Sequence, residues 1–128
     1  MSERRALQIV VALASLIPIS AGAAGVVLGP GLVDVTGAPI AADSHFRYLS
    51  GLLLGIGLAF ITTIPRIEAQ KARFRALAAI VVIGGLARLL SILLLGYPDR
   101  PMALALVMEL VVTPSLAFWQ ARVAHRQG

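Results

Sequence analysis

The sequence predicts an all-α, polytopic membrane protein: a bundle of four transmembrane helices with both termini in the cytoplasm. Of its 128 residues, 59% are hydrophobic and only 13% are charged. A soluble domain averages roughly 45–50% apolar residues and about 25% charged residues. The apolar residues are gathered into four long runs, and most Lys and Arg residues lie in the connections on one side of these runs. Four spans of about 20 residues leave too little chain for a soluble domain. This excludes a globular cytosolic enzyme and a separate receptor domain.

Each apolar run is long enough to cross a hydrocarbon core of ~30 Å as a helix. The expected spans are 6–28, 44–64, 76–95 and 102–121, and together they form a single membrane domain over residues 1–128. The first run also admits a signal peptide, with charges at 4–5, an apolar region at 6–20 and a small-residue cleavage site at 21–23. The apolar run continues through 26–28, and this favours a retained span.

The connections between the spans contain recognisable turn formers. Glycines and prolines fill the first connection, 29–43, where we expect an ordered cap over the outer mouth of the bundle. At its end, Asp43-Ser44 offers an N-cap for the second span. The short connection 96–101 predicts a tight turn that makes the third and fourth spans antiparallel neighbours, with Pro101 in the first turn of the fourth span.

Small residues recur along one face of most spans, where they allow helices to approach closely. Packing within the chain is the interpretation that we favour, and homodimerisation through Gly51-xxx-Gly55 is the alternative. Prolines inside the first and fourth spans, Pro18 and Pro114, predict kinks. The small-residue faces are Arg47, Gly51, Gly55 and Ala59 on the second span, Pro18, Gly22, Gly25 and Gly29 on the first, and Gly84, Arg88 and Ser91 on the third.

The charges of the connections predict the orientation, because cytoplasmic loops are enriched in Lys and Arg. The termini and the connection between spans two and three carry eight such residues, while the other two connections carry only Arg100. We therefore expect both termini and the middle connection inside, with Tyr48 and Tyr97 at the outward membrane interface and Trp119 at the inward one. The eight residues are Arg4, Arg5, Arg66, Lys71, Arg73, Arg75, Arg122 and Arg126.

Two ionisable residues lie at membrane depth on neighbouring spans. Arg88 is seven positions before the end of span three and Glu109 seven positions after the start of span four, so each lies about 10 Å below the outward boundary. An isolated charge there costs roughly 2.5–3.5 kcal/mol or more, so we expect an ion pair. Arg47 is shallower, about 5 Å below that boundary, and Asp43 and His45 lie at the rim.

The expected ion pair has two interpretations. In the first interpretation, the pair is a buried salt bridge that fixes helix packing, and Arg47 extends outward to water. In the other interpretation, Arg88 and Glu109 form the floor of a polar pocket that opens outward, with Ser91 beside them. Two arginines against one intramembrane carboxylate favour an anionic headgroup, a carboxylate or a phosphate as the ligand.

No catalytic, cofactor-binding or metal site is expected from the sequence. Cysteine is absent, the consecutive residues Asp43, Ser44 and His45 point in different directions, and His45 shares no metal-ligand spacing with the acidic residues. The net charge of +5 does not indicate a nucleic-acid partner, because the basic residues flank apolar spans and are not interleaved with stacking aromatics. The protein is therefore not expected to be an enzyme.

Motifs in spans two to four also carry a resemblance. They are Arg47-xxx-Gly51-xxx-Gly55, then Gly84-Gly85-Leu86-Ala87-Arg88-xx-Ser91, Gly96, Pro98 and Glu109-Leu110. With them the chain, from residue 5 to about 122, resembles a bacterial domain-of-unknown-function family of short four-helix integral membrane proteins. That family is itself distantly similar to the DoxX-like membrane proteins. The sequence departs from the family's pattern at Leu95, where an acidic residue is expected. The resemblance implies four membrane helices and singles out the same arginines, serine and glutamate, but it implies no reaction.

These observations predict a small accessory or binding protein of the bacterial inner membrane, surrounded by the lipid bilayer. It is expected to hold an anionic lipid or small metabolite in an outward pocket. One alternative is a transporter or carrier that acts as a homo-oligomer, since four short helices rarely enclose a path alone. Another is a structural subunit that binds partner proteins in a larger membrane complex. The expected polar cluster is Arg47, Arg88, Ser91, Glu109, His45 and Asp43.

Overall fold

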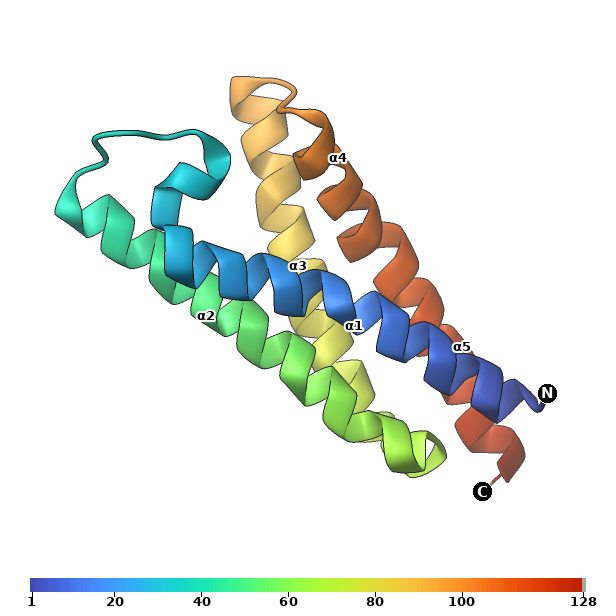
Figure 1. Ribbon diagram of the computed structural model, residues 1–128. Helices are drawn as coiled ribbons and strands as arrows, with labels where there is room; N and C mark the ends of the chain where they lie inside the picture. Colours follow the sequence, from blue (N-terminus) through green and yellow to red (C-terminus); the bar gives the residue numbers. More distant parts are fainter. Residues whose placement is uncertain (128) are drawn as a thin grey trace. The chain divides into compact units, whose positions relative to one another are not determined.

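The computed structural model describes residues 1–127, and these residues form helices with no β-strand (Figure 1). The predicted all-α class is confirmed. In chain order the elements are α1 (Glu3–Leu28), the 3-10 turn η1 (Gly29–Val33), α2 (Ile40–Thr63), the 3-10 segment η2 (Ile64–Ala69), α3 (Lys71–Leu95), α4 (Arg100–Val107), the π-helical turn η3 (Met108–Val112) and α5 (Thr113–Gln127).

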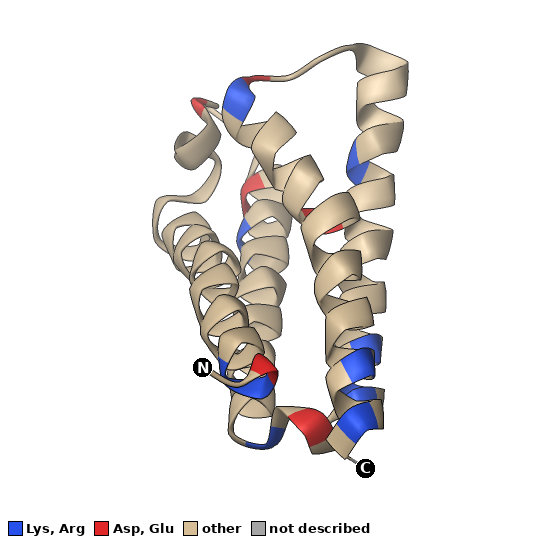
Figure 2. Cartoon of the chain, turned by 90° about the vertical axis from the view of Figure 1, so that its right-hand side faces the viewer, with Lys and Arg blue, Asp and Glu red and all other residues tan. Residues whose placement is uncertain are grey.

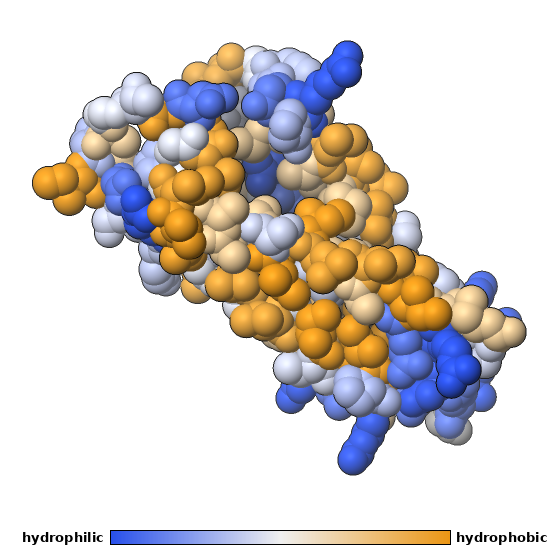
Figure 3. Space-filling view, viewed as in Figure 1, coloured by the Kyte–Doolittle hydropathy of each residue, from blue (hydrophilic) through white to orange (hydrophobic). Residues whose placement is uncertain are grey.

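Four helical stretches within residues 1–127 are long and apolar enough to cross a membrane: α1, α2, α3 and the continuous run from α4 to α5. Large apolar side chains such as Leu13, Leu93 and Leu95 are exposed along them. Figure 3 shows hydrophobic side chains over much of the visible surface. An apolar surface of this extent is compatible with lipid and not with water. The chain is therefore a multi-pass membrane protein.

Contacts divide the chain into two compact units, which we describe separately. The first unit comprises Met1–Leu7 and Pro65–Gly128, and the second comprises Gln8–Ile64. The second unit contains most of α1 together with α2. The first contains α3 to α5 and the opening turn of α1.

In the second unit, α1 and α2 pack closely at glycines. A Cβ added at Gly22 would lie 2.5 Å from the backbone nitrogen of Leu54, and one added at Gly57 would lie 2.7 Å from Cγ1 of Ile19. Real Cβ atoms do not approach other atoms so closely, so only glycine fits at these two positions. The expected packing within the chain is therefore present between the first two spans.

The glycines of α2 that were predicted to pack are not the ones that make the close contact. A Cβ at Gly55 would meet no atom of its own unit within 4 Å, and one at Gly51 would meet only the Val26 side chain, at 3.9 Å. The face of α2 that contacts α1 instead carries Ser50 and Leu54. Adjacent residues of a helix differ in direction by about 100°, so a shift of one position selects a different face.

The predicted N-cap at Asp43-Ser44 is wrong. Helix α2 begins earlier, at Ile40, and its N-cap position is Pro39, which has no capping side chain. Asp43 lies inside the first turn, where its carboxylate accepts a hydrogen bond from Arg47 Nε at 2.8 Å. A carboxylate near a helix N-terminus is favoured by the helix dipole even without capping, and an i,i+4 arginine gives it a partner.

In the first unit, α3 lies beside α4, η3 and α5. The tight turn between α3 and α4 is present and makes these helices antiparallel neighbours, as expected (Figure 1). Gly96 ends α3 with a φ of 104°, a conformation that favours glycine. Asp99 then caps α4 by accepting a hydrogen bond from the Met102 N–H at 3.1 Å, and Pro101 lies in the first turn of α4 as predicted.

Candidate functional site

A close contact between α3 and η3 positions the ion-paired residues of the first unit. A Cβ at Gly85 would lie 2.8 Å from Glu109 Cβ and 2.8 Å from Leu110 Cδ2. The missing side chain therefore lets η3 approach α3, and Arg88 lies one turn further along the same face of α3. The face predicted for the third span contained Gly84, which meets nothing within 4 Å in its unit. Gly85 is the glycine that packs.

Glu109 lies in the π-helical turn η3. Pro114, which follows this turn, has no N–H to donate to the carbonyl four residues earlier. The backbone widens before the proline, and the Thr113 N–H donates to the carbonyl of Met108, five residues back. The Thr113 hydroxyl donates to the same carbonyl at 2.8 Å. The proline predicted a kink at this place, but not the π-turn that carries the glutamate. Such turns are frequent at functional sites.

The expected contact between Arg88 and Glu109 is present. Arg88 Nε donates to Glu109 Oε2 at 3.0 Å, and Nη2 donates to Oε1 at 3.1 Å. The pair is bidentate, which is the strong geometry for an arginine and a carboxylate. Both side chains are part-buried, with exposed fractions of 32% and 18%. Their charges compensate one another at the depth where an unpaired charge is costly.

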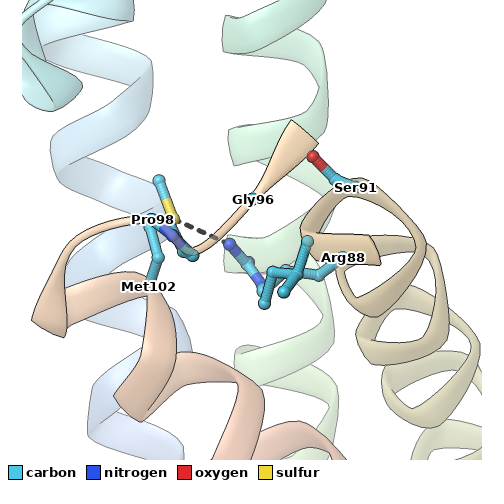
Figure 4. A pocket seen from close by; sticks show the side chains of 6 residues that line it. Arg88, Ser91, Gly96, Pro98 and Met102 are labelled. Carbon is cyan, nitrogen blue, oxygen red and sulfur yellow. Dashed lines mark hydrogen bonds between the residues drawn. The ribbon is translucent and has the colours of Figure 1, made fainter. Parts of the chain in front are cut away.

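A cavity of about 320 Å³ lies beside the guanidinium of Arg88 (Figure 4). Arg88 Nη1 makes its contact there with the sulfur of Met102, at 2.8 Å. The Ser91 hydroxyl has no hydrogen-bond partner among the described residues of its unit. Met102 was not among the residues predicted for the site, although it lies seven residues before Glu109 and therefore on the same helix face. The lining residues are Arg88, Ser91, Ile92, Gly96, Pro98 and Met102.

The remaining residues of the predicted cluster, Asp43, His45 and Arg47, belong to the second unit. There Arg47 Nη1 donates to the carbonyl oxygens of Val26 and Val27 at 2.6 and 3.0 Å. These carbonyls lie in the last turn of α1, so Arg47 satisfies backbone acceptors that the helix end leaves unpaired. His45 is exposed on α2. The structure thus joins Arg47 to Asp43 in one unit and Arg88 to Glu109 in the other.

A second polar cluster, which was not predicted from the sequence, joins the start of α1 to the end of α5 in the first unit. The carboxylate of Glu3 accepts hydrogen bonds from Trp119 Nε1 at 3.2 Å and from Arg126 Nη1 at 2.7 Å. It also accepts from Arg122, through Nε at 3.0 Å and through Nη2. The signal was the spacing of Trp119, Arg122 and Arg126, which places three donors on one face of a helix.

The same end of the first unit contains the predicted basic residues of both termini and of the middle connection. Arg4 pairs with Glu68 at 2.7 Å and donates to the carbonyl of Pro65 at 2.9 Å. The buried amide of Gln120 donates to the carbonyl of Ile67 at 2.7 Å. Figure 2 shows the basic residues near the two chain ends and around the connection into α3. We call the part of the first unit formed by residues 1–7, 65–75 and 119–127 the basic end.

Fold and site together define a small multi-pass membrane protein with four apolar helices and an arginine–glutamate pair beside a cavity. The chain belongs to the family described as "Domain of unknown function (DUF4345)", whose model matches residues 6–120. The resemblance to an unknown-function family of short membrane proteins is thereby confirmed. No curated protein and no solved structure shows significant similarity to the chain. The distant similarity to DoxX-like proteins stays a prediction.

Proposed function

We propose that this protein is a small binding or accessory protein of the bacterial inner membrane, and that the Arg88 cavity holds an anionic lipid or a small anionic metabolite. The observation that carries the proposal is the contact between Arg88 Nη1 and the sulfur of Met102. A thioether is a weak hydrogen-bond acceptor, so a carboxylate or phosphate oxygen in the cavity would be a stronger partner for this N–H group.

The neighbouring residues support a binding role. Glu109 holds Nε and Nη2 of Arg88, so the guanidinium is fixed with Nη1 beside the cavity (Figure 4). Methionine is unbranched and flexible, and Met102 can therefore yield its position to a ligand. The unpartnered hydroxyl of Ser91 supplies a second polar contact. We propose binding without chemical transformation, because these groups offer no nucleophile with an adjacent general base.

Mass spectrometry of the intact protein, purified in mild detergent, tests this proposal. We expect an anionic small molecule or lipid to remain bound. Ser91→Ala is expected to lower its retention about fivefold, the effect of one hydrogen bond worth roughly 1 kcal/mol. Ser20→Ala is the matched control, because the Ser20 hydroxyl bonds only to carbonyls of its own helix, those of Leu16 and Ile17. Equal retention in both variants would contradict the proposal.

A structural role is the second candidate function, and the bidentate geometry of the Arg88–Glu109 pair favours it. In that case the pair fixes the packing of α3 against η3, and the protein serves as a subunit of a larger membrane complex. The same purification distinguishes the two functions. Co-purifying subunits with no small molecule would support the structural role, and a defined homo-oligomer would support the transporter alternative.

We also propose that both termini face the cytoplasm, because eight of the nine Lys and Arg residues outside the spans lie in the termini and the middle connection. A cytoplasm-dependent reporter is expected to be active when fused after Gly128 or inserted near Lys71. The same reporter near Thr36 is expected to be inactive, and a periplasm-dependent one active there. An extracytoplasmic C-terminus would contradict this orientation.

A further inference from the structure

A groove on α5 in the first unit lies outside the Arg88 site. Its cavity is about 380 Å³ and is lined by Ser115, Phe118, Trp119 and Arg122. These residues are spaced i, i+3, i+4 and i+7, so they form one stripe along the helix. Phe118 is 78% exposed, and the Arg122 side chain is 60% exposed. The groove is therefore open to the surroundings of the protein.

The stripe changes from apolar to basic along the helix. Phe118 and Trp119 belong to the end of the apolar fourth span, and Arg122 and Arg126 follow within two turns. Aromatic rings followed by basic side chains are typical of the boundary between the hydrocarbon and the headgroups of a bilayer. An amphiphile that enters this groove would meet rings at its apolar part and a guanidinium at its polar part.

Arg122 keeps donors for a ligand. Its Nε and Nη2 donate to Glu3, while the described residues of its unit supply no acceptor for Nη1. The guanidinium has five N–H groups in all, and the two on Nη1 remain available as charged donors to a phosphate oxygen. Glu3 thus holds Arg122 in place without using all of its donors.

The charge around the groove favours an anion. Eight Lys and Arg residues belong to the same unit at the basic end, against only two acidic residues, Glu3 and Glu68. Both acids are already paired, Glu3 with Arg122 and Arg126 and Glu68 with Arg4. A negatively charged headgroup near such a cluster is favoured by each basic residue that lies close to the membrane surface.

We propose that this groove binds an anionic phospholipid of the adjoining leaflet. The lipid phosphate accepts hydrogen bonds from Arg122 Nη1, and an acyl chain lies along Phe118. Trp119 donates to Glu3 through its indole nitrogen and so presents the rest of its ring to the lipid. The site is distinct from the Arg88 cavity, with which it shares no lining residue.

The test uses the full chain reconstituted in vesicles of phosphatidylglycerol and phosphatidylcholine in equal amounts, followed by mass spectrometry of the lipids retained. We expect phosphatidylglycerol to be retained preferentially, and Arg122→Gln to lower this preference about fivefold, the effect of one basic contact. Phe118→Ala is expected to lower total lipid retention, because it removes the ring along which the acyl chain lies. Phe118 is exposed and has no packing role in the fold, so this variant is expected to fold like the parent. Arg100→Gln, which removes a charge outside the basic end, is expected to change neither quantity.

Glu3→Gln separates lipid binding from a merely structural role of the cluster. It weakens the Glu3–Arg122 pair but keeps Arg122, so the preference for phosphatidylglycerol is expected to persist or rise. A parallel loss in Glu3→Gln and Arg122→Gln would overturn the proposal, as would an Arg122→Gln variant that behaves like the parent. If excess inorganic phosphate abolished the preference, the ligand would be free phosphate, and the assignment to a lipid would be wrong.

Discussion

Replacement of Arg88 and Glu109 together by leucine is expected to give a folded protein at least as stable as the parent. Well-packed apolar residues in place of a buried ion pair are often neutral or stabilising by roughly 1–4 kcal/mol. Each single replacement is expected to lower the free energy of unfolding by up to about 2.5–3.5 kcal/mol, because it leaves one charge unpaired at membrane depth. Thermal unfolding of the three variants in detergent micelles measures this order of stability.

The same double variant distinguishes a binding site from a packing contact. If the Arg88 cavity holds an anion, the folded double-leucine protein is expected to lose its bound molecule and to fail to complement a deletion strain. Full complementation by a stable double variant would contradict the binding proposal and leave the structural role. A double variant less stable than both single variants would contradict the pairing itself.

Replacement of Gly22 by alanine is expected to destabilise the contact between α1 and α2 strongly. The added methyl group would lie 2.5 Å from Leu54 N and 2.8 Å from the Ser50 carbonyl oxygen. These are backbone atoms, so relief requires the two helices to separate, and overpacking of this kind costs about 1–3 kcal/mol or more. The unfolding midpoint in detergent is expected to fall accordingly.

Gly55→Ala is the matched control for Gly22→Ala, since a Cβ at Gly55 meets no atom of its own unit. Its unfolding midpoint is expected to stay the same or rise slightly, because alanine favours a helix by roughly 1 kcal/mol over glycine. If the unfolding midpoint fell by a similar amount in both variants, the glycines would matter for helix conformation and not for the α1–α2 contact. A selective loss of dimer in Gly55→Ala would instead support the homodimer alternative.

The Arg88–Glu109 contact could be predicted because it depends on little more than chain connectivity. A six-residue connection, 96–101, makes the two helices antiparallel neighbours, and equal distances from that connection then give the two charges equal depth. The cost of an unpaired charge in the bilayer makes their pairing favourable. The π-turn around Glu109 could not be derived in this way, because it depends on how the backbone relaxes before Pro114. The contact of Met102 with Arg88 depends on side-chain conformations that connectivity does not fix.

The hydrogen-bond partners of Arg47 could not be predicted from the sequence either. Its depth was predicted from its position in the second span, but its hydrogen bonds go to Asp43 and to the carbonyls at the end of α1. Those partners depend on where α2 begins and on how the α1–α2 connection folds. Similarly, the basic residues of the termini were predicted as a topology signal, while their pairing with Glu3 and Glu68 required the folded first unit.

The all-α class, the number of apolar helices and the antiparallel pairing of the last two spans could all be predicted from the sequence. These features follow from local composition, because about 20 consecutive apolar residues are what a bilayer requires of a helix. The packing face of α1 was predicted correctly, since its stripe of Pro18, Gly22, Gly25 and Gly29 does meet α2. On the other two helices only the tertiary structure decided the packing glycine, which differs by one or two positions from the predicted one: Gly57 and not Gly55 on α2, and Gly85 and not Gly84 on α3. The physical reason is that lipid is as apolar as the protein interior, so hydrophobicity marks no inward face. Helix contacts are then selected by the fit of small residues, and that fit exists only once the helices are packed.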